Sequence, residues 1–169
     1  MTEQQINLFQ GQTAASIIEA LRRHHSGASY GAPWAFFAEL RIGTGYGREA
    51  EQRIDAWAMA LWPSAQFKRV AYEVKISRSD FLREIKDPGK RRRAMVFSNE
   101  FYFATPFGLL KESEIPPECG LVEIRPDGRL RTVVDAPHRD TPPPSWRFMA
   151  AIIRRANDGR MDLAKQETA

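Results

Sequence analysis

The residues best suited to chemistry are two carboxylates and a lysine placed inside apolar segments. Asp55 lies in the apolar run 54–62, and Glu73 and Lys75 stand two positions apart in a second apolar run, 70–76. Charged side chains in half-buried strands are costly unless they are paired or bind a metal. Carboxylate oxygens suit Mg²⁺ or Mn²⁺, and a lysine beside them can offset negative charge on a phosphate. Such a set would supply the minimum for metal-assisted phosphodiester hydrolysis.

These three residues can meet only if two strands pair. The residue patterns at 53–62 and 68–77 predict strands joined by a short turn. Side chains alternate along a strand, so Glu73 and Lys75 should project from the same side, one step apart. If the Asp55 strand pairs beside them, the charged groups converge at one end of a sheet. We then expect the two carboxylates to lie close enough to share one cation.

The rest of the chain predicts one domain, 1–169, with neither repeats nor a second domain. Its core is expected at about 34–134, between an N-terminal helix at about 13–25 and a C-terminal helix at about 146–157 that frays after residue 157. Within the core, a helix capped by Ser79 or Asp80 would turn Phe81, Leu82 and Ile85 inward. The other elements expected there are a strand or helix-to-strand segment at 34–42, a helix at 90–97, and strands at 101–105, 121–124 and 130–134.

Composition narrows the setting. The chain has 169 residues, 43% of them hydrophobic, which suffices for one moderate core. Its apolar stretches fall short of the ~20 residues that span a bilayer. The N-terminus lacks the pattern of a signal peptide. Cys119 is the single cysteine, which excludes an internal disulfide and a cysteine-based zinc site. We therefore expect a cytoplasmic protein that does not associate with membranes.

Positive charge is concentrated in residues 83–93. Six basic residues in this window outweigh Glu84 and Asp87, so it alone carries the excess of +4 found for the whole chain. A basic stripe near an acidic site is typical of proteins that handle a phosphate backbone. The alternative is a solvated helix face, because three successive arginines fan over ~200° of a helix. The candidate nucleic-acid contacts are Arg78, Lys86, Lys90 and Arg91.

The order helix, strand with Asp55, strand with Glu73-Val74-Lys75, helix, strand resembles the core of the PD-(D/E)XK nuclease superfamily. The longer run 72–82, followed by 101–106, resembles more narrowly the MmcB-type DNA-repair proteins and related uncharacterised phage and bacterial proteins. The resemblance covers roughly the middle half of the chain. In one departure, Ile54 rather than proline precedes Asp55, which leaves the chemistry untouched.

The resemblance implies an α/β fold with a restriction-endonuclease-like core, in which helices flank a small mixed sheet of about four or five strands. It also implies a nuclease that depends on Mg²⁺ or Mn²⁺ and acts on DNA in repair, recombination or phage DNA processing. Asp55 and Glu73 would be metal ligands, with the backbone carbonyl of Val74 as another. Lys75 would position the water or offset charge in the transition state.

One further acidic ligand is expected on an earlier element in this family. Glu39 is our candidate, and Glu49 and Glu51 compete for the role.

Other interpretations stay open. Asp55, Glu73 and Lys75 could form a surface ion pair on an edge strand, where most such pairs have no catalytic role. The chain could be a non-catalytic nucleic-acid-binding module on a nuclease-like fold, although its complete set of three charged residues favours catalysis. It could also be a protein-interaction or assembly factor. The oligomeric state is open, with a homodimer among the options.

Overall fold

A single mixed sheet positions the rest of the molecule. The computed structural model describes residues 12–26, 33–42 and 52–167. In this part of the chain six strands form one sheet whose order follows the sequence. The first three strands pair antiparallel, the next two run parallel to the third, and the last closes an antiparallel hairpin. They are β1 (Trp34–Arg41), β2 (Arg53–Ala60), β3 (Arg69–Val74), β4 (Glu100–Pro106), β5 (Gly120–Ile124) and β6 (Leu130–Val134).

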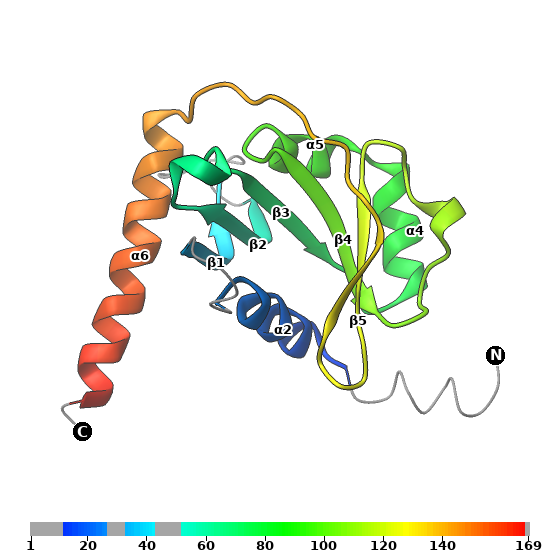
Figure 1. Cartoon of the computed structure of the whole chain (residues 1–169), viewed down its shortest axis with the longest axis horizontal. Helices are drawn as coiled ribbons and strands as arrows, with labels where there is room; N and C mark the ends of the chain where they lie inside the picture. Colours follow the sequence, from blue (N-terminus) through cyan, green and yellow to red (C-terminus); the bar gives the residue numbers. More distant parts are fainter. Residues whose placement is uncertain (1–11, 27–32, 43–51, 168–169) are drawn as a thin grey trace.

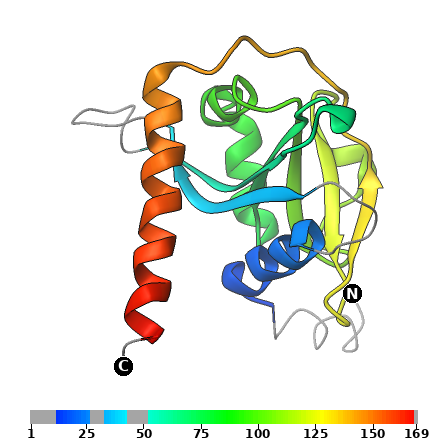
Figure 2. The ribbon, with the colours of Figure 1, turned by 60° about the vertical axis from the view of Figure 1, so that its left-hand side comes forward.

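Helices cover both faces of the sheet (Figures 1 and 2). The helix α2 (Ala14–Ser26) packs on one face, and α4 (Arg78–Lys86), α5 (Gly89–Met95) and the start of α6 (Trp146–Glu167) pack on the other. Two 3₁₀ turns, η1 (Pro63–Ala65) and η2 (Glu112–Glu114), lie in the connections. Of the helices described, none is both long and apolar enough to cross a bilayer.

Two buried clusters hold these layers together. Under α2, Ile17 and Leu21 pack against Tyr72 and Tyr102. Under α4, α5 and α6, the fully buried side chains of Phe81, Phe101, Phe103 and Phe148 share a cluster with Trp57. Fully burying one such aromatic side chain contributes about 1.5–3 kcal/mol. The sheet is therefore held rigid from both sides, and its strand ends can present side chains in fixed positions.

The predicted α/β class with a mixed sheet is confirmed, and several details differ. The sheet has six strands in the described residues rather than four or five. The last helix runs on to Glu167 instead of ending near residue 157. Leu82 does not face inward, since it is 38% exposed. Helix α4 begins with Ser77 as its cap rather than Ser79 or Asp80. Phe81 takes the inward position, and Leu82, about 100° further round the helix, turns toward solvent.

A buried histidine near the end of α2 predicts a pH dependence of stability. Nε2 of His25 lies 2.8 Å from the Tyr72 hydroxyl. Burial, followed by the nearby charges of His24 and Lys68, lowers the pKa of His25 from 6.5 to about 4. Between these two values the unfolded chain binds a proton that the folded chain does not, so stability falls as the pH falls. We expect a loss of about 2 kcal/mol between pH 7 and pH 5 in urea denaturation.

Two histidine variants test whether His25 causes this pH dependence. His25→Gln should remove most of the pH dependence, whereas His138→Gln should keep it, because His138 is exposed. Equal pH dependence in His25→Gln and the unmodified protein would contradict the assignment.

Candidate active site

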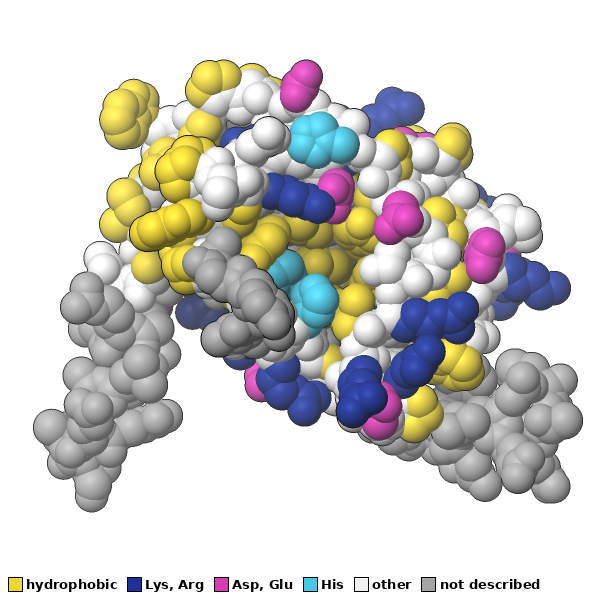
Figure 3. Space-filling model, viewed as in Figure 1, with side chains coloured by type: hydrophobic (Ala, Val, Ile, Leu, Met, Phe, Trp, Pro, Cys, Tyr) yellow, Lys and Arg dark blue, Asp and Glu magenta, His cyan; other side chains and the backbone are white. Residues whose placement is uncertain are grey.

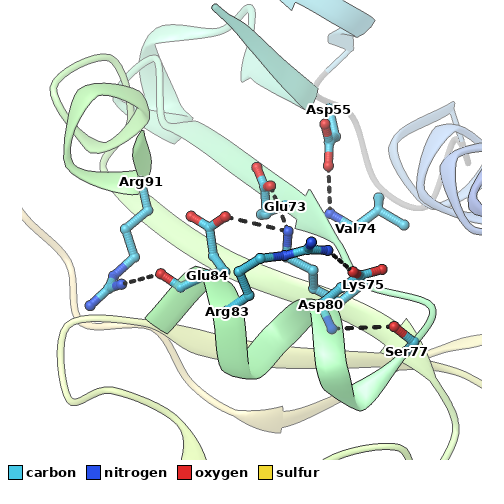
Figure 4. Close-up of polar contacts among 9 residues, drawn as sticks. All are labelled: Asp55, Glu73, Val74, Lys75, Ser77, Asp80, Arg83, Glu84 and Arg91. Atoms are coloured by element: carbon cyan, nitrogen blue, oxygen red, sulfur yellow. Dashed lines mark hydrogen bonds and ion pairs between the residues drawn. The ribbon is translucent and has the colours of Figure 1, made fainter. Parts of the chain in front are cut away.

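The centre of the site is a lysine buried between two carboxylates (Figure 4). Nζ of Lys75 donates to Oε1 of Glu73 at 2.9 Å and lies 3.5 Å from Oε2 of Glu84. The three side chains are only 11%, 5% and 9% exposed, respectively. The prediction that Glu73 and Lys75 project together is confirmed. Their burial excludes the surface ion pair that the sequence left open.

The inward face of α4 brings Glu84 to this centre. The Ser77 hydroxyl accepts a hydrogen bond from the Asp80 backbone N–H at 3.3 Å, which caps the helix. Phe81 turns inward and packs edge-to-face on Phe103, with ring centroids 5.0 Å apart. Glu84 follows three positions after Phe81 and therefore lies on the same side of the helix. We did not predict Glu84, although its spacing from an inward phenylalanine was a usable signal.

Asp55 reaches the site through an irregularity in the sheet. The β1–β2 pairing is continuous except at Glu39 and Asp55, which lie between the pairs Ala38↔Ala56 and Leu40↔Ile54. Glu39 has a left-handed backbone, with φ of 53°. In a regular strand, residues three positions apart point to opposite faces. Ile54 and Trp57 nevertheless pack in the same cluster, so the alternation of side chains along β2 is interrupted between them.

The Asp55 side chain caps the end of β3. Its Oδ2 accepts a hydrogen bond from the Val74 backbone N–H at 2.9 Å. This bond takes the place of a ladder bond to β2, so Asp55 lies beside Glu73-Val74-Lys75 at one end of the sheet (Figure 4). The carboxylate has a structural role there in addition to any chemical one.

The other acidic candidates lie elsewhere. The Glu39 carboxylate contacts the Arg53 guanidinium at 3.4 Å, and both side chains are about half exposed. This contact turns it toward solvent, and Glu84 fills the place of a further acidic group beside Lys75. Glu49 and Glu51 lie outside the described residues.

An open cavity borders the buried lysine. It has a volume of about 530 Å³, and Val74, Lys75 and Glu84 form its inner wall. Asp80 and Arg83 form an ion pair that also lines it. The hydrogen bond from Ser77, together with the Arg83 charge, holds the pKa of Asp80 below its usual range. Lys75, which is 11% exposed, and Arg83, which is 81% exposed, are the basic side chains, among the residues described, that line this cavity.

The site carries an excess of negative charge that suits a cation. Two carboxylates, Glu73 and Glu84, contact the single Lys75 ammonium, and the Asp55 carboxylate lies nearby at the Val74 N–H. Oε1 of Glu84 is buried and accepts no hydrogen bond. A buried carboxylate oxygen without a donor is costly and is a ready ligand.

The described residues offer few protein ligands for a metal ion. Among the described residues, no three His, Cys, Asp or Glu side chains are close enough to form a complete metal cage. Mg²⁺ does not need one, since it keeps several waters and is commonly bound by one or two carboxylates and substrate phosphates. The residues present therefore fit Mg²⁺ or Mn²⁺, and they fit a fully protein-caged ion poorly.

The predicted phosphate contacts divide into two groups. Arg91 is buried, with Nη2 2.8 Å from Oε1 of Glu118 and Nη1 3.4 Å from the Glu84 carbonyl oxygen. Hydrogen bonding to Arg91 lowers the pKa of Glu118, which strengthens the pair. Arg91 therefore braces α4 from α5, and a phosphate could reach it only by breaking those bonds.

Two of the remaining basic candidates, Arg78 and Lys86, lie at the surface. Arg78 pairs with Glu114, and Lys86 is exposed at the end of α4. The Lys90 side chain lies outside what the structure describes. Arg83, on the same helix as Lys86, is 81% exposed and is the basic side chain that lines the cavity together with Lys75.

Comparison with known proteins identifies the fold. No protein-family model matches this chain, and no curated protein matches it. Among solved structures it is similar to the SPO1766 protein of unknown function from Silicibacter pomeroyi. The two share 21% sequence identity with a TM-score of 0.58 over 93% of this chain and 90% of that one. At this identity the likeness establishes an α/β fold with a six-stranded mixed sheet.

Proposed function

We propose that the protein is a divalent-metal-dependent nuclease that hydrolyses DNA phosphodiester bonds. The observation that carries this proposal is the Lys75 ammonium, buried between Glu73 and Glu84 at the wall of an open cavity. Burying such charges costs desolvation free energy, and apolar residues of similar size are often as stable in their place. Buried charge beside a cavity therefore fits a reaction site better than a scaffold.

The order of elements supports the same proposal. Asp55 lies on β2, Glu73 and Lys75 on or next to β3, and α4 then leads toward β4, which runs parallel to β3. This arrangement is the one expected of a restriction-endonuclease-like core. DNA repair, recombination or phage DNA processing would be the setting for such an enzyme.

The role of each residue follows from its chemistry. A water attacks the phosphorus, the bond to the leaving oxygen breaks, and negative charge builds on the phosphoryl oxygens. The Lys75 ammonium is placed to orient that water or to offset this charge. Asp55 and Glu73 would hold Mg²⁺ or Mn²⁺, with Glu84 as a further carboxylate and the Val74 carbonyl as a backbone ligand. The metal, when bound, lowers the pKa of a water and stabilises charge on the phosphate.

A second candidate is a non-catalytic DNA-binding module on the same fold. The observation that favours it is Asp55, whose carboxylate accepts the Val74 N–H in the manner of a structural cap. If that bond is the main role of Asp55, the site lacks one of its metal ligands. The two candidates differ in cleavage and not in binding.

A cleavage panel separates them. The full chain is incubated with single-stranded, duplex, flapped and branched DNA, and with RNA, in Mg²⁺, Mn²⁺ or a chelator. We expect cleavage of at least one DNA substrate with metal and none with the chelator. Glu84→Gln should lower cleavage, and Glu112→Gln, in the exposed turn η2, should not. Binding without cleavage of any substrate would favour the second candidate.

Two arginines of the basic window, Arg83 and Arg91, should behave differently in DNA binding. Arg83→Ala removes an exposed cation from the cavity, so the slope of log affinity against log salt should decrease in magnitude by ~0.9 on duplex DNA. Arg91→Ala should leave that slope unchanged and lower the free energy of unfolding by about 1–3 kcal/mol, because Glu118 and a carbonyl lose their donor. Salt titrations and urea denaturation measure both. A changed slope in Arg91→Ala alone would move the DNA surface to α5.

A further inference from the structure

A second cavity lies on the opposite face of the sheet, beside α2. Its volume is about 240 Å³. Figure 3 shows this face hollowed, with histidine side chains at the edge of the hollow and hydrophobic side chains within it. The aromatic rings of Trp34, Tyr72 and Tyr102 line the cavity together with the aliphatic Leu130. The Glu73–Lys75–Glu84 cluster does not line it, so the cavity is separate from the proposed active site.

The rings in this cavity are held in place. Tyr72 and Tyr102 stack with ring centroids 5.9 Å apart and an interplanar angle of 26°. The Tyr72 hydroxyl bonds to His25 at 2.8 Å. A Cβ on Gly120 would lie 2.4 Å from two carbons of the Tyr102 ring, so this ring lies directly on the β5 backbone. Fixed aromatic rings lose little conformational freedom when a planar ligand packs on them.

The charged groups of the cavity, Lys68 and Glu100, form an ion pair that carries no net charge. Nζ of Lys68 lies 2.6 Å from Oε1 of Glu100, and the Tyr102 hydroxyl donates to Oε2 at 3.2 Å. The Lys68 and Glu100 charges cancel. His25 is neutral near pH 7, because burial lowers its pKa to about 4. Such a cavity has no preference for a charged ligand such as a phosphate.

We propose that this cavity binds a nucleobase, an uncharged planar ring that carries hydrogen-bond donors and acceptors on its edge. The rings of Trp34, Tyr72 and Tyr102 would pack on the base, and Lys68 and Glu100 would bond to its edge. Aromatic side chains bind bases of any sequence in this way. The volume lies below the ~300–1,000 Å³ of pockets for drug-sized ligands, which suits one small ring system.

The base could come from a free nucleoside or from a strand of nucleic acid. The proposal stands whether or not the protein is a nuclease, because it uses none of the residues around Lys75. A free nucleoside would make the cavity a small-molecule site. A base displaced from a strand would make it a second contact for nucleic acid, on the face away from Lys75.

Filling the cavity tests the proposal. Leu130→Trp places a large ring in the cavity, and Arg131→Trp places the same ring on the other face of β6, where Arg131 is exposed. Binding of adenosine, guanosine, cytidine, thymidine and uridine, and of single-stranded DNA and RNA, is measured by titration calorimetry. We expect Leu130→Trp to weaken binding by about tenfold or more, the size expected for a lost stacking contact, and Arg131→Trp to leave it unchanged.

Comparing the binding of nucleosides with that of single strands shows whether the base is a free ligand or part of a nucleic acid. A nucleoside that binds alone and is lost in Leu130→Trp identifies a free ligand. Binding of strands only, weakened in Leu130→Trp, identifies a base within nucleic acid. If Leu130→Trp does not fold, Lys68→Met removes the donor from a partly exposed position, with Lys111→Met as its control. The proposal is overturned if no probe binds, or if every probe binds the cavity variant as tightly as the unmodified protein.

Discussion

Lys75→Met is expected to abolish most DNA cleavage and to destabilise the metal-free protein. Cleavage should fall by about 10²–10³-fold or more, because the ammonium acts where charge develops in the transition state. Without divalent cations, the free energy of unfolding should fall by about 3–5 kcal/mol, since Glu73 and Glu84 remain buried without their cation. Single-turnover cleavage under matched metal, and urea denaturation with and without Mg²⁺, measure the two effects.

Added metal should restore part of the lost stability in this variant. A divalent cation that binds the carboxylates can take over the charge of the missing ammonium, and binding to the folded state alone raises stability. Lys111→Met, at an exposed position, should change neither cleavage nor stability by more than about 0.5 kcal/mol. If Lys75→Met cuts DNA as well as the unmodified protein, the nuclease proposal fails. If its stability is unchanged, the buried ion cluster is not a structural unit.

Asp55→Asn and Asp55→Ala are expected to separate the two roles of this carboxylate. Both changes remove the negative charge, so both should lose most metal-dependent cleavage. Asparagine keeps an oxygen that can accept the Val74 N–H, and its stability should stay close to that of the unmodified protein. Alanine leaves that N–H without its partner, which should cost about 1–3 kcal/mol.

The hydrogen bond reverses an expectation based on charge alone. Removing one of several clustered carboxylates would relieve repulsion and raise stability. Because the Val74 N–H depends on Asp55, the sign should be negative for alanine. Full cleavage by Asp55→Asn would show that the carboxylate acts only as a cap on the Val74 N–H and is not a metal ligand. High Mn²⁺ should rescue part of the Asp55→Asn activity if the loss is one of metal affinity.

Local pattern in the sequence predicted the parts of the site that depend on strand geometry alone. Glu73 and Lys75 are two positions apart, and alternation within a strand is enough to place them together. Their burial followed from the apolar residues around them. The pairing of β2 with β3 needed only a short connection between two apolar runs. These features depend on residues within about one strand length of each other.

The parts that the sequence did not predict depend on contacts between distant elements. Glu84 reaches Lys75 because Phe81, three positions earlier on α4, packs against Phe103 of β4 and so fixes which face of the helix turns inward. Arg91 lies in a basic run that looks solvent-exposed, yet Glu118, which is 27 positions away, draws it inside. Glu39 was assigned from its residue type, and the left-handed backbone that turns it toward Arg53 has no signature in an L-residue's identity.

Helix α6 covers a strand that would otherwise lie exposed at an edge of the sheet. The first strand, β1, lies at an edge of the sheet, and α6 packs on it, with Nε of Arg155 3.3 Å from the Ala38 carbonyl oxygen. An uncovered edge strand is a template on which another chain can add a strand. During synthesis β1 emerges well before α6, so this edge of the nascent chain stays uncovered until α6 has been made. A chain truncated before Trp146 would keep that edge open and should aggregate through β1.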